Sequence, residues 1–331
     1  MSRVPLLVRI PNWLGDLVLS LPVLESAAAG PAIVVGPEPF RALLEPRFPT
    51  IRYIATNRAR RWDAVSAIRR LGPQTALLLT DSLSSALVVW AARVPVRIGH
   101  DAEGRGVLLT RRVRRRGPAR TASRAAEYRE LAVAAGLPEP PPTPRLEALP
   151  AETARAREIL GRAWAGSPAY LAVAPGASYG PAKQWEPERF VESSAAAARS
   201  SGLGVVVVGA SDDRDATAAV AGGIRRAGVP SLDLAGKTHL PELVGILAGA
   251  AAVLSNDSGA MHLAAALGRP TGAIFGSTSP VWTSATVPWV TNLYAAYPCS
   301  PCYRRTCPIG YRCLRAIPAA EAAAALGRLT R

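Results

Sequence analysis

The sequence predicts an α/β protein with two doubly wound parallel sheets, each covered by helices. Short apolar runs with the length of buried strands alternate with alanine-rich stretches that suit crossover helices. This alternation occurs twice in the 331 residues, and a proline-rich segment at 136–150 separates the two halves as a linker. We therefore expect two domains, residues 1–145 and 146–331, with a ligand cleft between them.

Eight apolar runs are expected to form the buried strands of these sheets. In the first half they are Leu6–Ile10, Ala32–Val35, Ala76–Thr80 and Val94–Ile98. In the second half they are Tyr170–Ala174, Gly204–Gly209, Val253–Ser255 and Thr271–Phe275. The intervals between the runs are long enough for the helices that connect parallel neighbours.

The chain is strongly basic, with 39 lysine and arginine residues against 24 acidic residues and a net charge of +15. Such a charge indicates nucleic acid, a phospholipid surface or a phosphorylated substrate as the partner. Only two of the basic residues are lysines, Lys183 and Lys237, and arginines cluster at 110–124. Because no apolar run approaches the ~18 residues of a membrane-spanning helix and no signal-peptide pattern begins the chain, the predicted location is the cytoplasm.

The first predicted strand leads into the stretch Pro-Asn-Trp-Leu-Gly-Asp, which places a single carboxylate, Asp16, directly after Gly15. Two interpretations are open: Asp16 caps the following helix, or it takes part in chemistry. The stretch differs from the Gly-x-Gly-x-x-Gly loop of dinucleotide-binding proteins. The chain also contains no Walker loop and no Gly-x-Ser-x-Gly nucleophile elbow, which argues against the enzyme classes that use them.

A second candidate site lies at residues 253–280, where a strand, a short polar turn and a helix follow one another. The helix is predicted at Ala260–Leu267. Free backbone N–H groups and the helix dipole make the start of such a helix an anion site. The alternative interpretation is that Asp257 or Ser258 caps the helix and that His262 packs within it.

A third candidate site, residues 173–190, is again a strand that ends in a loop with glycine and serine. Lys183 follows this loop, where a lysine suits the neutralisation of phosphate charge. Two such loops in one half indicate a site for a nucleoside diphosphate. Residues 205–216 add an acidic loop in which Asp213 and Asp215 form an Asp-x-Asp triplet. An acid there holds a metal, caps the next helix or binds a ribose hydroxyl.

Four cysteines lie within 15 residues with the spacing C-x2-C-x4-C-x5-C: Cys299, Cys302, Cys307 and Cys313. In a cytoplasmic protein such clustering favours a metal over disulfides. Four thiolates suit a tetrahedral structural zinc. The spacing matches no standard zinc fold, so free thiols and disulfides stay open as alternatives.

Four stretches together resemble glycosyltransferase family 9, the ADP-heptose:lipopolysaccharide heptosyltransferases, and within it the heptosyltransferase II branch. They are PNWLGDLVLSLPVL, PGASYGPAKQW, LAGKTHLPELVGILAGAAAVLSNDSGAMHLAAALGRP and CSPCYRRTCPIGYRC. The resemblance implies a GT-B architecture, in which two doubly wound Rossmann-like domains face each other across a cleft. It places the acceptor on the first domain and the nucleotide sugar on the second. The last helix, expected within Ile317–Leu329, would cross back to the first domain.

The resemblance also implies an inverting reaction that needs no metal or other cofactor for catalysis. Asp16 matches the residue that acts as general base and takes the proton from the acceptor hydroxyl. Gly15 is expected to allow a tight turn and, with Asn12 and Trp13, to contact the acceptor. Lys183 is expected to take part in catalysis by stabilising the leaving ADP.

Further residues are implied to bind the nucleotide sugar. Thr238 matches a position that contacts the adenine end, and Asp212 or Asp213 is expected to hold the ribose. The donor-binding residues expected in this way are Ser178, Lys183, Asp213, Thr238, Asp257, Ser258, Gly259 and His262.

The implied donor is ADP-L-glycero-D-manno-heptose, and the implied acceptor is the phosphorylated lipid A–inner core of lipopolysaccharide. The arginines at 110–124 would attract this acceptor at the inner membrane face, where anionic lipid contributes about 1 kcal/mol per nearby basic residue; a solvated loop is the alternative. A family 9 enzyme that uses another nucleotide sugar for a different cell-envelope glycan stays open. A basic nucleic-acid-binding protein is a more distant alternative, and without a recognition motif no nucleic acid is expected as partner.

Overall fold

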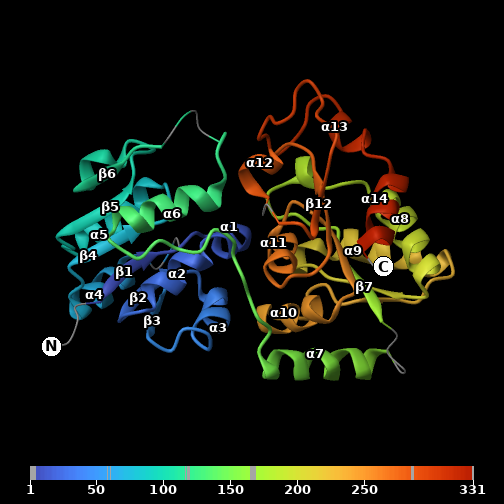
Figure 1. Cartoon of the computed structure of the whole chain (residues 1–331), viewed down its shortest axis with the longest axis horizontal. Coiled ribbons are helices and arrows are strands. Elements are labelled where there is room, and N and C mark those ends of the chain that lie inside the picture. The colour runs from blue at the N-terminus through green and yellow to red at the C-terminus, as the bar shows by residue number, and fades with distance from the viewer. Residues whose placement is uncertain are drawn as a thin grey trace. The chain divides into compact units, whose positions relative to one another are not determined.

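The computed structural model describes residues 5–57, 59, 61–115, 117, 120–164, 169–284 and 287–329 (Figure 1). The chain divides into two compact units, Met1–Pro144 and Arg145–Arg331, and each has its own sheet and its own hydrophobic core. The division falls within the proline-rich segment, where the sequence analysis placed a boundary after residue 145.

The first unit is built on a six-stranded parallel sheet with the order β3-β2-β1-β4-β5-β6. The strands are β1 (Leu6–Arg9), β2 (Ala32–Gly36), β3 (Ile51–Ala55), β4 (Thr75–Leu78), β5 (Val96–His100) and β6 (Arg111–Val113). The helices are α1 (Leu14–Leu19), α2 (Leu21–Ala27), α3 (Arg41–Leu44), α4 (Arg61–Leu71), α5 (Leu83–Ala91) and α6 (Arg124–Ala134), with 3-10 turns η1 (Glu38–Phe40) and η2 (Arg105–Leu108). In the register, Leu6 of the central strand pairs with Ala32 on one side and Thr75 on the other.

The second unit repeats this plan with the order β12-β11-β10-β7-β8-β9. The strands, all parallel, are β7 (Tyr170–Ala174), β8 (Gly204–Val207), β9 (Ser231–Asp233), β10 (Ala252–Asn256), β11 (Thr271–Phe275) and β12 (Val290–Tyr294). The helices are α7 (Pro150–Ala163), α8 (Pro187–Ser201), α9 (Arg214–Arg226), α10 (Leu240–Gly249), α11 (Gly259–Ala266), α12 (Pro280–Thr283), α13 (Arg312–Arg315) and α14 (Ala319–Leu329), with 3-10 turns η3 (Pro181–Lys183) and η4 (Ser211–Asp213). None of the helices in the described residues is both long and apolar enough to cross a bilayer.

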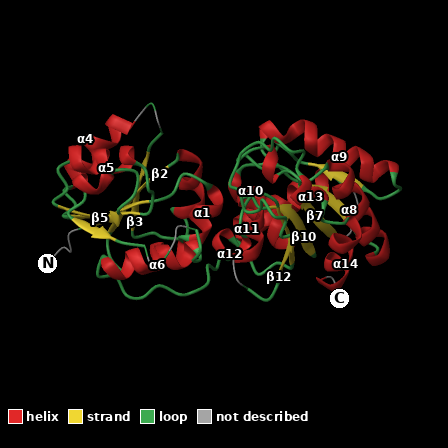
Figure 2. Cartoon of the chain, turned by 90° about the horizontal axis from the view of Figure 1, so that it is seen from above, coloured by secondary structure: helices red, strands yellow, loops and turns green. Residues whose placement is uncertain are grey.

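Both sheets have the same topology, because the strand order counted within each unit is 3-2-1-4-5-6. Figure 2 shows α4 and α5 on one side of the first sheet and α6 on the other. In open parallel sheets of this order, ligands bind beyond the carboxyl ends of the strands where the order reverses. That point lies between β1 and β4 in the first unit and between β7 and β10 in the second.

The eight predicted strands are the eight inner strands of the two sheets, and all of them are confirmed. The four strands that were not predicted, β3, β6, β9 and β12, are the two edges of each sheet. Inner strands of parallel sheets are buried on both faces and need a continuous apolar run, whereas edge strands are partly exposed and carry polar side chains. The edge strand β6, for example, reads Arg-Arg-Val, and β9 reads Ser-Leu-Asp.

The last helix, α14, packs on the second unit's own core, where it lies against α8 (Figure 1). Its buried face consists of small or apolar residues, Ala319, Ala322, Ala325 and Leu326, which join the same cluster as Phe190 of α8. Small side chains allow two helices to approach closely, so the alanine-rich face fits this position. The expected crossing of this helix to the first domain is not what the structure shows, because α14 is a layer of the second unit.

We expect Leu326→Ala to lower the free energy of unfolding by about 2–5 kcal/mol, because Leu326 is fully buried and its loss leaves a cavity in the core. Urea unfolding followed by circular dichroism measures the change. The matched control is Arg328→Ala at an exposed position of the same helix, which should change the value by less than about 0.5 kcal/mol. Equal effects of the two substitutions would show that α14 is not part of the core.

Candidate active site

In the second unit, the carboxyl ends of β7 and β10 are held together by Asn256, the last residue of β10. Its Nδ2 donates to the carbonyl oxygen of Pro175 at 2.6 Å, and its Oδ1 accepts from the backbone N–H of Trp185 at 3.1 Å. Asn256 is fully buried, so these hydrogen bonds form away from competing water. No role for Asn256 was predicted from the sequence, although a polar residue at the end of a buried strand is a usable signal.

The next residue, Asp257, has a carboxylate that accepts hydrogen bonds and forms ion pairs with residues from several segments. Lys183 Nζ lies 2.6 Å from Asp257 Oδ2, and the hydroxyl groups of Thr278 and Thr283 donate to the same oxygen at 2.5 and 3.3 Å. His262 Nε2 lies 3.7 Å from the other oxygen, Oδ1. The Lys183 and Asp257 side chains are only 11% and 2% exposed. The structure therefore brings together three of the predicted donor-binding residues, Lys183, Asp257 and His262.

The residues around Asp257 lower the pKa of its carboxyl group. Burial on its own raises the pKa of the carboxyl group, but the positive charge of Lys183 and the contact with His262 lower it by more, so that it lies well below its usual range. Asp257 is therefore a buried, fully charged carboxylate. Lys183 is fixed in position by this partner.

Helix α11 begins directly after Asp257, with Ser258 as its N-cap residue and Gly259 as its first helical residue. The Ser258 side chain makes no capping hydrogen bond and lies 3.0 Å from the hydroxyl group of Ser255 instead. Ser258 therefore stands at the N-cap position, but its side chain does not cap the helix. Because the first N–H groups of a helix have no partner within it, this helix start beside Lys183 has the properties of an anion site.

Asp213 lies against the loop that follows β7. Its Oδ2 accepts from the backbone N–H of Ala210 at 3.0 Å, within the 3-10 turn η4. Asp213 is the N-cap residue of α9 but makes no side-chain capping hydrogen bond there, so the expected capping of this helix is not observed. A Cβ atom on Gly176 would lie 2.2 Å from the carboxyl carbon of Asp213, so this close approach requires glycine. Burial raises the pKa of Asp213. Ser178 is exposed in the loop after β7, and Thr238 is half-buried between β9 and α10.

The first unit places Asp16 in the first turn of α1, the first helix after β1. Asp16 Oδ1 faces Arg124 Nε at 3.8 Å, and 30% of the Asp16 side chain is exposed. The N-cap residue of α1 is Trp13. Gly15 has ordinary helical backbone rather than a positive φ, so the tight turn expected there is absent.

The other two predicted acceptor-binding residues lie between β1 and α1. Asn12 accepts a hydrogen bond from Arg9 Nη2 at 2.6 Å through its side-chain oxygen. Trp13 is 48% exposed, which is unusual for so large an apolar ring. Asn12 is thus held in place, while the Trp13 ring is open to a ligand.

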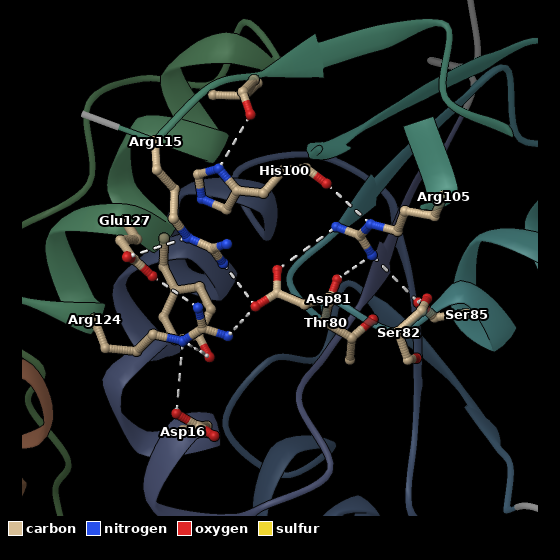
Figure 3. Close-up of polar contacts among 12 residues, drawn as sticks. Asp16, Thr80, Asp81, Ser82, Ser85, His100, Arg105, Arg115, Arg124 and Glu127 are labelled. Atoms are coloured by element: carbon tan, nitrogen blue, oxygen red, sulfur yellow. Dashed lines mark hydrogen bonds and ion pairs between the residues drawn. The ribbon is translucent and has the colours of Figure 1, made fainter. Parts of the chain in front are cut away.

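A second carboxylate, Asp81, follows β4 and belongs to the same polar network as Asp16 (Figure 3). Arg124 donates to Asp81 Oδ2 at 3.1 Å and to Glu127 Oε2 at 2.7 Å, in addition to facing Asp16. Arg115 contacts Asp81 Oδ2 at 2.6 Å and Glu127 Oε1 at 3.2 Å. Arg124 therefore links Asp16 to Asp81, which the sequence analysis missed although Asp81 comes just after a buried strand.

Arg105, which is fully buried, approaches Asp81 from the opposite side at 3.7 Å (Figure 3). Its guanidinium donates to the carbonyl oxygen of His100 at 2.9 Å and to that of Thr80. Burial raises the pKa of Asp81, but the surrounding guanidinium groups lower it by more, so that the pKa lies below its usual value. Asp81 is thus held as a charged group by three arginines.

The arginine-rich segment 110–124 contributes two residues to this network, because Arg115 and Arg124 form internal ion pairs. The sequence analysis treated the segment as a surface for an anionic partner. Within its described residues, the arginines that are exposed are Arg111, Arg112, Arg114 and Arg120. Among the arginines of this segment that the structure describes, these four lie on the surface, where a partner can reach them.

The four cysteines are free thiols in the structure. Cys299 and Cys302 are exposed, Cys307 is partly buried, and Cys313 is buried, which raises the pKa of its thiol. No three of the histidine, cysteine and acidic side chains in the described residues are grouped so that they could hold a metal ion. No three of the four thiols therefore converge on one point in this arrangement, and the structural zinc expected from the spacing stays a prediction.

The two Rossmann-like sheets have the same strand order, and each has charged residues beyond its switch point, the place where the strand order reverses. Together they define a GT-B fold of the kind that glycosyltransferases use. A family model for glycosyltransferase family 9 (heptosyltransferase) matches residues 64–312. The chain belongs to this family and is a glycosyltransferase, as the resemblance implied.

Individual relatives agree with this assignment. The chain is 30% identical to lipopolysaccharide heptosyltransferase 2 of Escherichia coli (strain K12) over 297 residues, which is 84% of each protein. It is 34% identical to lipooligosaccharide heptosyltransferase 2 of Haemophilus influenzae over 221 residues, 63% of this chain and 62% of that one. The solved structure of E. coli ADP-heptose lipopolysaccharide heptosyltransferase II matches 98% of both chains with a TM-score of 0.82 and 26% identity.

We expect Asp81→Asn to be less stable than the wild type at pH 7 by about 1.5–3 kcal/mol, because the arginines lose a charged hydrogen-bond partner. The lowered pKa means that this stabilisation is present above the ordinary value of 3.8 and is lost as the pH falls through the folded-state pKa. The difference between variant and wild type should therefore shrink at about pH 3. Urea unfolding at both pH values measures it.

The matched control for this prediction is Asp63→Asn, at an exposed position in the first turn of α4. It should differ from the wild type by less than about 0.5 kcal/mol at either pH. If Asp81→Asn loses as much stability at about pH 3 as at pH 7, the charge of Asp81 is not the cause.

Proposed function

We propose that this protein transfers heptose from ADP-L-glycero-D-manno-heptose to the inner core of lipopolysaccharide, in the manner of its heptosyltransferase 2 relatives. The observation that carries the proposal is the buried Lys183–Asp257 pair beside the start of α11, at the carboxyl ends of β7 and β10. A lysine, a helix N-terminus and the switch point of a doubly wound sheet together suit a diphosphate. Both residues lie within the part of the chain that the family model matches.

The proposed donor site places the diphosphate at the start of α11, where the backbone N–H groups of Ser258 and Gly259 and the helix dipole stabilise negative charge. Lys183 and the exposed Ser178 border this place on the loop after β7. Thr238 and Asp213 follow neighbouring strands, and they are assigned to the adenine end and the ribose. His262 lines the same site through its contact with Asp257.

Asp16 is proposed as the general base. The acceptor hydroxyl must lose a proton as its oxygen attacks the anomeric carbon, and a carboxylate within hydrogen-bond reach accepts that proton. The Asp16 side chain is 30% exposed, so a substrate can reach it, and Arg124 faces it from the protein side. A single displacement of this kind inverts the configuration at the anomeric carbon. No metal is part of the proposal, since protein cations and N–H groups stabilise the leaving diphosphate.

The proposed acceptor is the phosphorylated lipid A–inner core. Exposed Trp13 offers an apolar ring beside Asp16, and the exposed arginines of segment 110–124 offer charge for phosphate groups and for an anionic membrane surface. We propose that the protein meets this acceptor as a peripheral protein at the cytoplasmic face of the inner membrane. Structural zinc at the cysteines stays a prediction from the sequence, which elemental analysis of the purified protein checks.

We expect Asp16→Ala to reduce the transfer rate at least about 100-fold, because the general base is lost. Binding of ADP, which involves the second unit, should stay within about twofold of the wild type. A radiolabelled heptose transfer assay and ADP calorimetry measure the two quantities. Turnover close to that of the wild type would remove Asp16 as the base, and a parallel loss of ADP binding would point to misfolding.

We expect ADP-heptose to raise the melting temperature of the wild type more than ADP-glucose, UDP-glucose or GDP-mannose at equal concentration. The physical reason is that a ligand stabilises the folded state in proportion to the logarithm of its concentration over its dissociation constant. Thermal melts of the purified protein with each nucleotide sugar test this order. A larger shift with a hexose nucleotide would assign the enzyme to a different cell-envelope glycan.

A further inference from the structure

Lys183 cannot by itself supply the positive charge that the leaving group needs. Its Nζ lies 2.6 Å from Asp257, and both side chains are nearly buried, so the pair carries no net charge. As the bond to the anomeric carbon breaks, its electron pair goes to the β-phosphate oxygen, and the diphosphate gains negative charge. A cation close to Lys183 whose charge is not balanced by a carboxylate would add to the stabilisation that the N–H groups at the start of α11 provide.

The loop at residues 295–311, which carries three of the four cysteines, is docked on the Lys183 region. The backbone N–H of Ala182 donates to the carbonyl oxygen of Arg305 at 3.0 Å, and the N–H of Tyr303 donates to that of Ser277 at 2.7 Å. The hydroxyl group of Tyr179 donates to the carbonyl oxygen of Tyr303 at 2.6 Å. These three bonds fix the 295–311 loop to the segments that follow β7 and β11.

The approach of the two loops is close at Gly180. A Cβ atom there would lie 2.7 Å from the carbonyl oxygen of Arg305, and Gly180 has a φ of 142°, which side chains rarely adopt. The glycine therefore allows the backbone of Arg305 to lie directly beside the residues that precede Lys183. The position of Arg305 is a product of tertiary packing and not of the local sequence.

The side chain of Arg305 turns toward the same aromatic ring as Lys183. Its guanidinium carbon lies 5.3 Å from the centroid of the Tyr179 ring, and Lys183 Nζ lies 5.0 Å from that centroid. Lys183 Nζ and the guanidinium carbon of Arg305 are thus at most about 10 Å apart, and both make a cation–π contact with the Tyr179 ring. Arg305 is exposed, and no carboxylate in the described part of the chain pairs with it. It keeps a full positive charge that a ligand can use.

We propose that Arg305 binds the diphosphate of the nucleotide sugar and stabilises the charge that develops on the leaving nucleoside diphosphate. The planar guanidinium matches two phosphate oxygens, which a lysine cannot do. Arg305 gives hydrogen bonds and takes no proton: the acceptor oxygen forms the new bond to the anomeric carbon, and its proton goes to the general base. This inference rests on the proposed function and adds a catalytic residue to it.

The test compares Arg305→Ala, Arg305→Lys and Arg304→Ala. Arg304 is the matched control, because it is the adjacent arginine and is also exposed. We expect Arg305→Ala to lower kcat with ADP-heptose about 100-fold, the usual effect of removing one group that stabilises developing charge. The Kd for ADP should rise about 10-fold. Arg305→Lys should recover part of both losses, and Arg304→Ala should stay within about twofold of the wild type.

Melting temperatures of all variants separate a chemical role from a structural one, since the backbone bonds of Arg305 persist in each. Arg305→Ala is expected to have the same melting temperature as the wild type but a lower kcat. If Arg305→Ala and Arg304→Ala behave alike, or if the loss of kcat is matched by a loss of melting temperature that lysine does not restore, the proposal is wrong.

The experiment also separates this proposal from the proposed function. If the wild type does not turn over ADP-heptose, the proposed function fails, and Arg305 is then judged on the binding of ADP, UDP and GDP by calorimetry. Weaker binding of any of these in Arg305→Ala, but not in Arg304→Ala, would still support a diphosphate contact. A wild type that binds none of them would overturn both proposals.

Discussion

A carboxylate that is buried in a protein needs compensating partners, and the second unit is organised around this requirement of Asp257. Its partners come from three segments: Lys183 after β7, His262 on α11, and Thr278 with Thr283 after β11. Each partner fixes one segment at the carboxyl edge of the sheet. Separating these segments would leave a buried charge without partners, which is strongly unfavourable. The geometry of the proposed donor site thus follows from the charge of one residue.

The first unit also has a carboxylate with compensating charged partners at the equivalent place in its sheet. Asp81 follows β4 and Asp257 follows β10, which are the fourth strands of two sheets with the same order. Three arginines surround Asp81 where one lysine holds Asp257. The two carboxylates differ in exposure, 25% for Asp81 against 2% for Asp257. The network of the first unit is therefore the more open one, and it reaches Asp16 through Arg124.

The sequence predicts features that one segment determines alone, and it misses those that depend on distant partners. Burial on both faces requires a continuous apolar run, so every inner strand was predicted and every edge strand was missed. The order of strand, loop and helix placed Lys183 and Asp257 on one edge of one sheet, but their direct contact joins residues 74 positions apart. Asp81 carries the same local signal as Asp16, and only the fold shows that Arg124 reaches both.

The net charge of +15 does not identify the cations that act on a ligand. A buried or partly buried cation next to a carboxylate is held firmly, but the pair has little net charge for a substrate. Lys183, Arg115 and Arg124 are of this kind. An exposed cation without such a partner keeps its charge but lacks a fixed position of its own. Arg305 combines the two properties, because backbone hydrogen bonds fix the loop that carries it, while its guanidinium has no acidic partner among the residues that the structure describes. The buried pairs thus set the shape of the site, and Arg305 on the docked loop supplies its positive potential.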